Sequence, residues 1–264
     1  MVKSDTRSFR SRVLAREPLL GSFINLGSAL AAEIAGHAGF DWLLLDHEHG
    51  PGGEETLLHQ LWACGAAGVP ACVRVAWNDP VRLKRALDLG PAAVMIPMVN
   101  SAAEAQAAVR AVRFPPRGNR GIAKISRSTG FGAHFDKLYY GDDDACALIV
   151  QIETPEAVAD VAAIAAVDGV DALFVGPVDL TANLGCLGNQ DHPDFVAARQ
   201  AVAAAARRHG KAAGILQLDA SRTTLHRDEG FSLITIGADA GVLFHGLRSI
   251  VAEAGPLMRE ERRP

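Results

Sequence analysis

Short apolar runs recur along this chain, and most are followed by a segment in which apolar residues are spaced three or four positions apart. Unbroken runs rich in Val, Ile and Leu are typical of parallel strands that are buried on both faces. Spacing of three and four is typical of helices with one buried face. The runs predict eight strands, at residues 22–26, 42–46, 71–75, 93–97, 147–152, 172–176, 212–216 and 233–236.

Capping signals mark the ends of the helices predicted between these strands. Asp79 followed by Pro80 predicts an N-cap and a first helical residue, and Ser101 with Glu104 predicts a capping box. Gly210 is a typical C-terminal residue of a helix. The predicted helices span residues 29–37, 54–66, 79–89, 101–113, 154–165, 194–209 and 220–229.

The alternation of strand and helix predicts a (β/α)8 barrel, formed by a single domain over residues 1–264. Such a barrel takes roughly 250 residues, which leaves little chain for a second domain. The alternative is a doubly wound open sheet. It is disfavoured because no GxGxxG motif follows the first predicted strand.

Composition and charge exclude several classes of protein. Apolar residues make up 49% of the chain, enough for a large core, and the net charge is −4. No Lys and Arg cluster suits a nucleic acid, no apolar run is long enough to span a membrane, and the charged first residues do not predict a signal peptide. The cysteines form no CxxC pair, so we expect reduced thiols and a cytoplasmic location.

Polar residues suited to catalysis stand where the predicted strands end. Asp-His-Glu-His follows the second strand at residues 46–49, and Arg74 ends the third. Gln151 and Glu153 end the fifth strand, and Asp179 follows the sixth. Ligands bind at the carboxyl ends of strands in parallel sheets and barrels, so these side chains should converge on one face. The convergence predicts an enzyme.

Glu153 and Asp179 follow consecutive strands, so their carboxylates can meet across the gap between those strands. Two carboxylates without a thiolate suit a hard divalent ion such as Mg²⁺ or Mn²⁺. The alternative is that both residues are N-caps of the helices that follow.

His47 and His49 stand beside Asp46 and Glu48. A neutral imidazole is well suited to move a proton near pH 7, and a neighbouring carboxylate can orient the ring. The alternative is that both histidines are ordinary polar groups of a loop.

Arg74 ends an apolar strand, where an unpaired charge is costly. Its guanidinium suits a carboxylate or an enolate oxygen, and the alternative is a structural ion pair with Asp88 or Glu48. Schiff-base chemistry is not indicated, because no lysine lies inside an apolar strand run.

Two long connections are predicted to follow the fourth and sixth strands, at residues 114–132 and 177–193. Long loops in compact domains are often functional. We expect both to lie over the mouth formed by the carboxyl ends of the strands.

Four motifs, WLLLDHEHGP at residues 42–51, VRVAWNDP at 73–80, VQIET at 150–154 and FVGPVDL at 174–180, resemble the HpcH/HpaI class II 2-oxo acid aldolases. The resemblance extends from Gly21 to Gly246. It implies a metal-dependent aldolase on a (β/α)8 barrel that cleaves a 4-hydroxy-2-oxo acid to pyruvate and an aldehyde. The substrate would be of the 4-hydroxy-2-oxoheptanedioate or 2-dehydro-3-deoxy sugar acid type.

The resemblance also implies roles for individual residues. Glu153 and Asp179 would bind the metal, which would be Mg²⁺, Mn²⁺ or Co²⁺. His49 would be the base, Asp46 its orienting partner, and Arg74 the group that stabilises the enolate oxygen. Asp88 would contact the catalytic residues and not the substrate. The expected substrate contacts are Gln151, Gly176, Pro177, Ser126 and Leu216.

The family resemblance further implies a homo-oligomer, typically a hexamer, in which a C-terminal helix near residues 242–252 packs on a neighbouring subunit. Relatives often have Gly where this chain has His47, which could line the mouth or compete as a base. Two alternatives stay open. One is an acyl-CoA lyase that binds the CoA phosphates through Arg117, Arg120 and Lys124. The other is a protein that binds a metal and a 2-oxo acid without catalysis.

Overall fold

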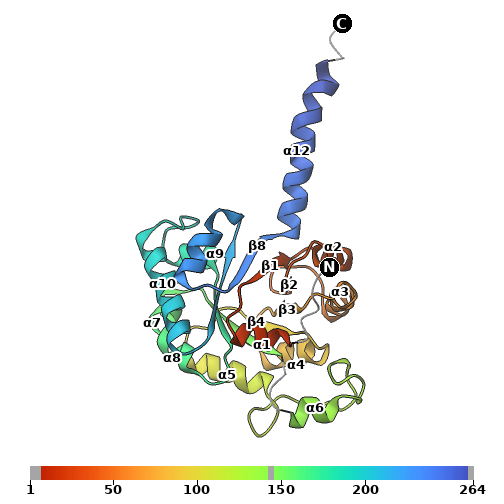
Figure 1. Cartoon of the computed structure of the whole chain (residues 1–264), viewed down its shortest axis with the longest axis vertical. Helices are drawn as coiled ribbons and strands as arrows, with labels where there is room; N and C mark the ends of the chain where they lie inside the picture. Colours follow the sequence, from red (N-terminus) through yellow and green to blue (C-terminus); the bar gives the residue numbers. More distant parts are fainter. Residues whose placement is uncertain (1–6, 142–145, 261–264) are drawn as a thin grey trace.

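The structure is a computed structural model that describes residues 7–141 and 146–260. Eight parallel strands pair in sequence order, and β8 pairs with β1 to close a barrel (Figure 1). The strands are β1 (Leu19–Ile24), β2 (Trp42–Asp46), β3 (Ala71–Arg74), β4 (Ala93–Ile96), β5 (Ala147–Ile152), β6 (Ala172–Val175), β7 (Ala212–Gln217) and β8 (Leu233–Ala238). The predicted (β/α)8 barrel is confirmed, and the open-sheet alternative is wrong. The first strand begins at Leu19 rather than Ser22.

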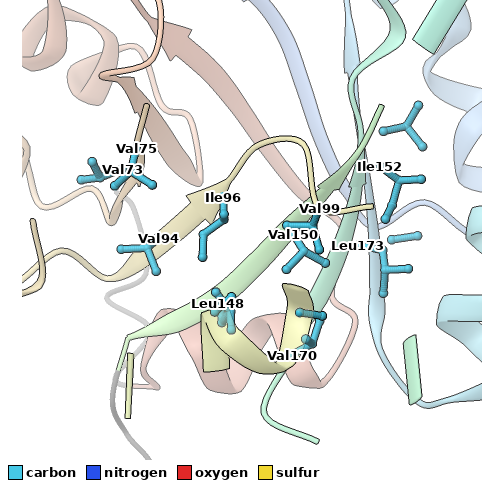
Figure 2. Close-up of a cluster of buried hydrophobic side chains, with 14 of the residues drawn as sticks. Val73, Val75, Val94, Ile96, Val99, Leu148, Val150, Ile152, Val170 and Leu173 are labelled. Atoms are coloured by element: carbon cyan, nitrogen blue, oxygen red, sulfur yellow. The ribbon is translucent and has the colours of Figure 1, made fainter. Parts of the chain in front are cut away.

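Both faces of the sheet are buried, which explains the unbroken apolar runs. Successive side chains of a strand point to opposite faces. Leu44, Met95 and Phe174 belong to the cluster inside the barrel. Their neighbours along the strands belong to the layer between the sheet and the helices, part of which Figure 2 shows with Val94, Ile96, Leu148 and Val150 among its members.

The helices between the strands follow the predicted pattern closely. Five have nearly the predicted bounds: α2 (Ala29–His37), α3 (Glu54–Ala67), α4 (Pro80–Asp88), α5 (Ala102–Val112) and α10 (Pro193–Arg208). The other two are each divided. Residues 154–165 contain α7 (Pro155–Ala159) and the start of α8 (Val161–Ala166), and residues 220–229 contain η2 (Ala220–Arg222) and α11 (Thr223–Glu229).

The predicted caps are largely present. The Asp79 carboxylate accepts hydrogen bonds from the backbone N–H groups of Val81 and Arg82. Ser101 accepts from the N–H of Glu104, but the Glu104 carboxylate accepts from Asn100 and not from Ser101. The predicted capping box is therefore only half formed.

A helix that the sequence did not predict, α1 (Phe9–Leu14), covers the end of the barrel where the strands begin. Phe9 and Val13 belong to the same buried cluster as Ala93 and Ala147, which are the first residues of β4 and β5. Arg10 fixes the helix there through two hydrogen bonds of 2.9 and 2.8 Å to the buried carboxylate of Asp171.

The two long connections lie at opposite ends of the barrel. Residues 177–193 follow β6 and include α9 (Pro177–Asn183), so they lie at the mouth as predicted. The described part of the connection between α5 and β5, residues 113–141, includes η1 (Arg127–Thr129) and α6 (Phe135–Tyr140). The guanidinium of Arg127 donates to the carbonyl of Leu89, just before β4. The prediction that this connection lies over the mouth is wrong for a single chain, because it follows a helix and not a strand.

The last helix, α12 (Asp239–Glu260), extends away from the barrel beyond the carboxyl ends of the strands (Figure 1). Its exposed apolar side chains include Leu243, Leu247, Ile250 and Val251. Within residues 7–141 and 146–260, no helix is long and apolar enough to cross a membrane.

Candidate functional site

A cavity of about 680 Å³ opens at the carboxyl ends of the strands. Six of the residues singled out by sequence line it as polar or charged side chains: Asp46, His49, Arg74, Gln151, Glu153 and Asp179. Gly176, Pro177 and Leu216 line it as well. The convergence predicted from the strand ends is therefore present in the folded chain.

Arg74 and Asp46 form a buried ion pair at the base of the cavity. The register of β2 and β3 places the two residues side by side. Nε and Nη2 of Arg74 donate to the two Asp46 carboxylate oxygens at 2.9 and 2.8 Å, and Nη1 lies 3.0 Å from Oε2 of Glu48. Burial alone would raise the pKa of Asp46, but the hydrogen bonds and charge of Arg74 hold it below its usual value.

In this chain the shortest hydrogen bonds of Asp46 come from Arg74 and not from the His49 ring. The Asp46 carboxylate accepts a hydrogen bond of 3.4 Å from the backbone N–H of His49. It accepts its two shorter hydrogen bonds from Arg74. The carboxylate beside the His49 ring is Glu48, whose Oε1 lies 3.8 Å from Nε2 of His49. Asp46 therefore orients Arg74, while Glu48 is in place to orient His49. Burial raises the pKa of Glu48 despite the opposing charge of Arg74.

Glu153 is held in place by two hydrogen bonds and is 2% exposed. Its Oε1 accepts from Nε2 of Gln151 at 2.8 Å, and its Oε2 accepts from the backbone N–H of Met98 at 3.1 Å. Burial raises the pKa of Glu153 to about 7; the Met98 bond opposes this rise, and Asp179 and Glu48 add to it.

Gly176 makes room for this carboxylate. A Cβ atom at position 176 would lie 2.1 Å from Oε1 of Glu153, closer than any side chain tolerates. The glycine at the end of β6 is therefore required by the position of the Glu153 side chain.

The N-cap alternative is wrong for Glu153, because Thr154 caps α7. Asp179 lies in the first turn of α9, whose N-cap is Gly176. Both residues line the cavity, and the charge of Asp179 acts on the pKa of Glu153.

The acidic groups fit a hard divalent ion. The charge of Asp179 raises the pKa of both Glu48 and Glu153, while the nearby Arg74 is engaged by Asp46 and Glu48. The buried Oε1 atom of Gln151 has no hydrogen-bond partner. In the described part of the chain, no three His, Cys, Asp or Glu side chains are arranged as a complete metal site. Two carboxylates would leave the other positions to water and substrate oxygens, as Mg²⁺ prefers.

Several predicted residues lie elsewhere. Asp88 and Ser126 are at the opposite end of the barrel, where Asp88 accepts from Nη2 of Arg120 at 3.2 Å and Ser126 lies 3.0 Å from the hydroxyl of Ser128. Within one chain they cannot touch a ligand in the cavity, because Asp88 ends α4 just before β4 and Ser126 lies in the connection between α5 and β5. His47 does not line the mouth either. Its Nε2 lies 2.9 Å from Oε1 of Gln60, in a small crevice between α3 and α4.

Other lining residues were missed from the sequence. Phe23 and Phe174 face the cavity from β1 and β6, and strand alternation could have identified them. Val178, Leu218 and His245 follow strands, and nothing in their spacing distinguishes them from ordinary surface residues.

Comparison with known proteins identifies the family. The sequence profile of the HpcH/HpaI aldolase/citrate lyase family matches residues 19–246. The 4-hydroxy-2-oxo-heptane-1,7-dioate aldolase of Salmonella dublin is 39% identical over 249 residues, which cover 94% of each chain. The chain belongs to the HpcH/HpaI family.

Solved structures of family members have the same architecture. An HpcH/HpaI aldolase/citrate lyase family protein from Burkholderia cenocepacia is 41% identical, with a TM-score of 0.89 over 94% of this chain and 99% of that one. The HpcH/HpaI aldolase of Desulfitobacterium hafniense is 27% identical, with a TM-score of 0.82 over 98% of both chains. The family resemblance seen in the motifs is confirmed, and the chain is a carbon–carbon lyase of the aldolase class.

Proposed function

We propose that this chain catalyses the reversible aldol reaction between pyruvate and an aldehyde, with a divalent ion bound by Glu153 and Asp179. The observation that carries the proposal is the meeting of these two carboxylates, Arg74 and His49 in one cavity. In the forward direction, pyruvate loses one methyl proton, its methyl carbon bonds to the aldehyde carbon, and the aldehyde oxygen gains one proton.

A divalent ion would supply the positive charge that stabilises the enolate of a 2-oxo acid. Glu153 and Asp179 would hold the ion, and Gln151 would hold Glu153 in position through its 2.8 Å hydrogen bond. Mg²⁺, Mn²⁺ and Co²⁺ all suit such a site.

Arg74 would share the negative charge of the enolate. Two of its five N–H groups donate to Asp46 and its Nη1 forms an ion pair with Glu48, which fixes the plane of the guanidinium before substrate binds. Donors oriented in advance contribute most to transition-state stabilisation.

His49 would carry the proton of the substrate 4-hydroxyl. Its side chain is 67% exposed at the mouth and lies beside Glu48. An imidazole that solvent can reach and that a carboxylate can orient suits proton transfer near pH 7.

Proton NMR of pyruvate in D₂O tests this proposal. We expect the methyl signal to decay in the presence of protein and Mg²⁺, Mn²⁺ or Co²⁺, and to persist after EDTA treatment. Glu153→Gln should abolish the decay, while Glu54→Gln, a matched change in an exposed ion pair with Arg85, should not. Persistence of the methyl signal with every metal would refute the proposal, and full exchange in EDTA would refute the role of the ion.

The same experiment separates the remaining alternative functions. A protein that binds metal and 2-oxo acid without catalysis would bind pyruvate but leave its methyl protons in place. The acyl-CoA lyase alternative is disfavoured, because Arg117, Arg120 and Lys124 belong to the connection at the far end of the barrel. Arg120 is also buried there against Phe114.

We further propose that α12 packs on another copy of the chain in a homo-oligomer, in keeping with the hexamer implied by the family resemblance. The helix is 22 residues long and exposes Leu243, Leu247, Ile250 and Val251 along its length. Sedimentation should give a hexamer, and Leu247→Glu with Ile250→Glu should give smaller species. A monomeric native protein would contradict this. The four free cysteines suit a reducing compartment, and we propose the cytoplasm.

A further inference from the structure

The chain leaves the regular geometry of the barrel just after β4. In the register of β4 and β5, Ile96 lies opposite Val150, and a parallel ladder continued from there would bring the N–H of residue 98 to the carbonyl of Gln151. The N–H that reaches this carbonyl belongs instead to Val99, at 3.2 Å. The segment between Ile96 and Val99 therefore contains one extra residue, as in a β-bulge.

The residue that this bulge releases from the ladder is Met98, whose backbone φ is 54°. This left-handed conformation is unfavourable for most residues that carry a side chain. In the described part of the chain, Arg16 and Phe131 share it, but they follow the helical turns α1 and η1, which commonly end in a left-handed residue. Met98 follows a strand, so no helix end explains its conformation.

The bulge is joined to the segment that carries Glu153. The backbone N–H of Met98 donates to Oε2 of Glu153 at 3.1 Å, in place of a bond within the ladder. The hydroxyl of Thr154 donates to Oδ1 of Asn100 at 2.6 Å, and the fully buried Val99 side chain anchors the residue between them. These contacts hold the Met98 N–H in a fixed position relative to the Glu153 carboxylate.

We infer that Met98 is a positioning residue, whose left-handed backbone presents the N–H group that orients Glu153 toward a divalent ion. The inference rests on the proposed function, in which Glu153 binds this ion, and adds the residue that fixes the ligand. Groups that hydrogen-bond a metal ligand typically contribute about 10- to 100-fold to metal affinity or activity. Because the donor is a main-chain atom, the side chain at position 98 matters through the backbone conformation that it allows.

Substitutions that differ in their tolerance of a left-handed backbone test this role. Asn and Gly adopt the conformation readily, whereas the β-branched Ile rarely does, although it is close to Met in volume. Met98→Ile should weaken Mn²⁺ binding, measured by titration with electron paramagnetic resonance, by about tenfold or more. It should lower kcat/KM for deuterium exchange into pyruvate in parallel. Met98→Asn and Met98→Gly should stay within about threefold of the native protein in both measurements.

Arg16→Ile is the matched control, because it places the same side chain on a left-handed residue after α1, at the far end of the barrel. It should leave the Mn²⁺ affinity unchanged. If the Met98 side chain acted by packing alone, the order of the variants would reverse, because Ile keeps the volume that Asn and Gly lose. That reversed order, or equal Mn²⁺ affinity in Met98→Ile and Met98→Asn, would overturn the inference.

Asn100→Ala tests the bulge without a change at position 98. It removes the acceptor of the Thr154 hydroxyl, and it should weaken Mn²⁺ binding by about tenfold, whereas Thr154→Ser, which keeps the hydroxyl, should not. Native affinity in Asn100→Ala would also overturn the inference. A native protein that neither binds Mn²⁺ nor exchanges pyruvate protons would overturn the proposed function itself. Normal binding and exchange with the wrong order of variants would overturn only the role of Met98.

Discussion

Replacing Gly176 with alanine tests whether the position of the Glu153 carboxylate matters for catalysis. The new Cβ would lie 2.1 Å from Oε1 of Glu153, and 2.9 Å from both Cδ and Cγ. A relaxed carbon–oxygen contact is roughly 3.3 Å, so the carboxylate must move by about 1 Å. Such a displacement would also stretch the bonds that Gln151 and Met98 donate to Glu153.

A misplacement of about 1 Å in a catalytic group costs roughly a hundredfold in rate, or about 2.7 kcal/mol of transition-state free energy. We therefore expect Gly176→Ala to lower kcat/KM for deuterium exchange into pyruvate by about that factor. The affinity for Mn²⁺, measured by titration with electron paramagnetic resonance, should fall in parallel.

Gly65→Ala is the matched control. Gly65 lies inside α3, and no atom comes within 4 Å of a Cβ built there. This variant should keep full activity and gain about 0.5–1 kcal/mol of stability, because glycine weakens a helix interior. If Gly176→Ala retains kcat/KM within threefold of the native value, the carboxylate does not need the position described here.

Three further predictions concern charged and titrating groups. Arg74→Lys should lower kcat/KM for exchange by about 10²–10³-fold, since a lysine cannot form the fork with Asp46 and also donate to an enolate; a loss under tenfold would contradict the role of Arg74. Asp46→Asn should cost about 3–5 kcal/mol in urea unfolding, because it leaves the Arg74 charge buried with a weaker partner. Asp191→Asn, which breaks the exposed ion pair with Arg222, should leave the midpoint of urea unfolding almost unchanged. Equal destabilisation by Asp46→Asn and Asp191→Asn would contradict this argument. Burial lowers the pKa of His226 to about 4, so the folded state prefers the neutral ring and loses stability as pH falls from 6.5 towards 4. In thermal melts, His226→Phe should reduce this loss of stability. If the melting temperatures of the native and variant proteins fall in parallel with pH, the prediction is wrong.

Hydrophobic periodicity was sufficient to predict the barrel, because strands buried on both faces leave an unmistakable run of apolar residues. Leu43, Leu44 and Leu45 are all fully buried although alternate residues face opposite sides of the sheet. The helix α1 was missed because only Phe9 and Val13 carry its apolar contacts, and the helix is six residues long. Its position depends on the ion pair with Asp171, which lies far away in the sequence.

The convergence of the site could be predicted, but the partners within it could not. Position at a strand end identified Arg74, Glu153 and Asp179, and the topology then brought them together. Whether the Asp46 carboxylate accepts hydrogen bonds mainly from Arg74 or from His49 depends on the directions of side chains on two neighbouring strands. These directions cannot be deduced from the order of residues in the sequence. Ser126 was expected at the cavity from the family resemblance, but in this chain it lies in the connection between α5 and β5, away from the carboxyl ends of the strands.

The ion pair between Arg10 and Asp171 joins residues 161 positions apart. On a ribosome that adds roughly 5–20 residues per second, Asp171 is made about 8 to 30 s after Arg10. During that interval the cluster that receives Phe9 and Val13 is incomplete, because Ala172 and Phe174 of β6 have not yet been made. Helix α1 therefore completes its packing only after β6 has been made.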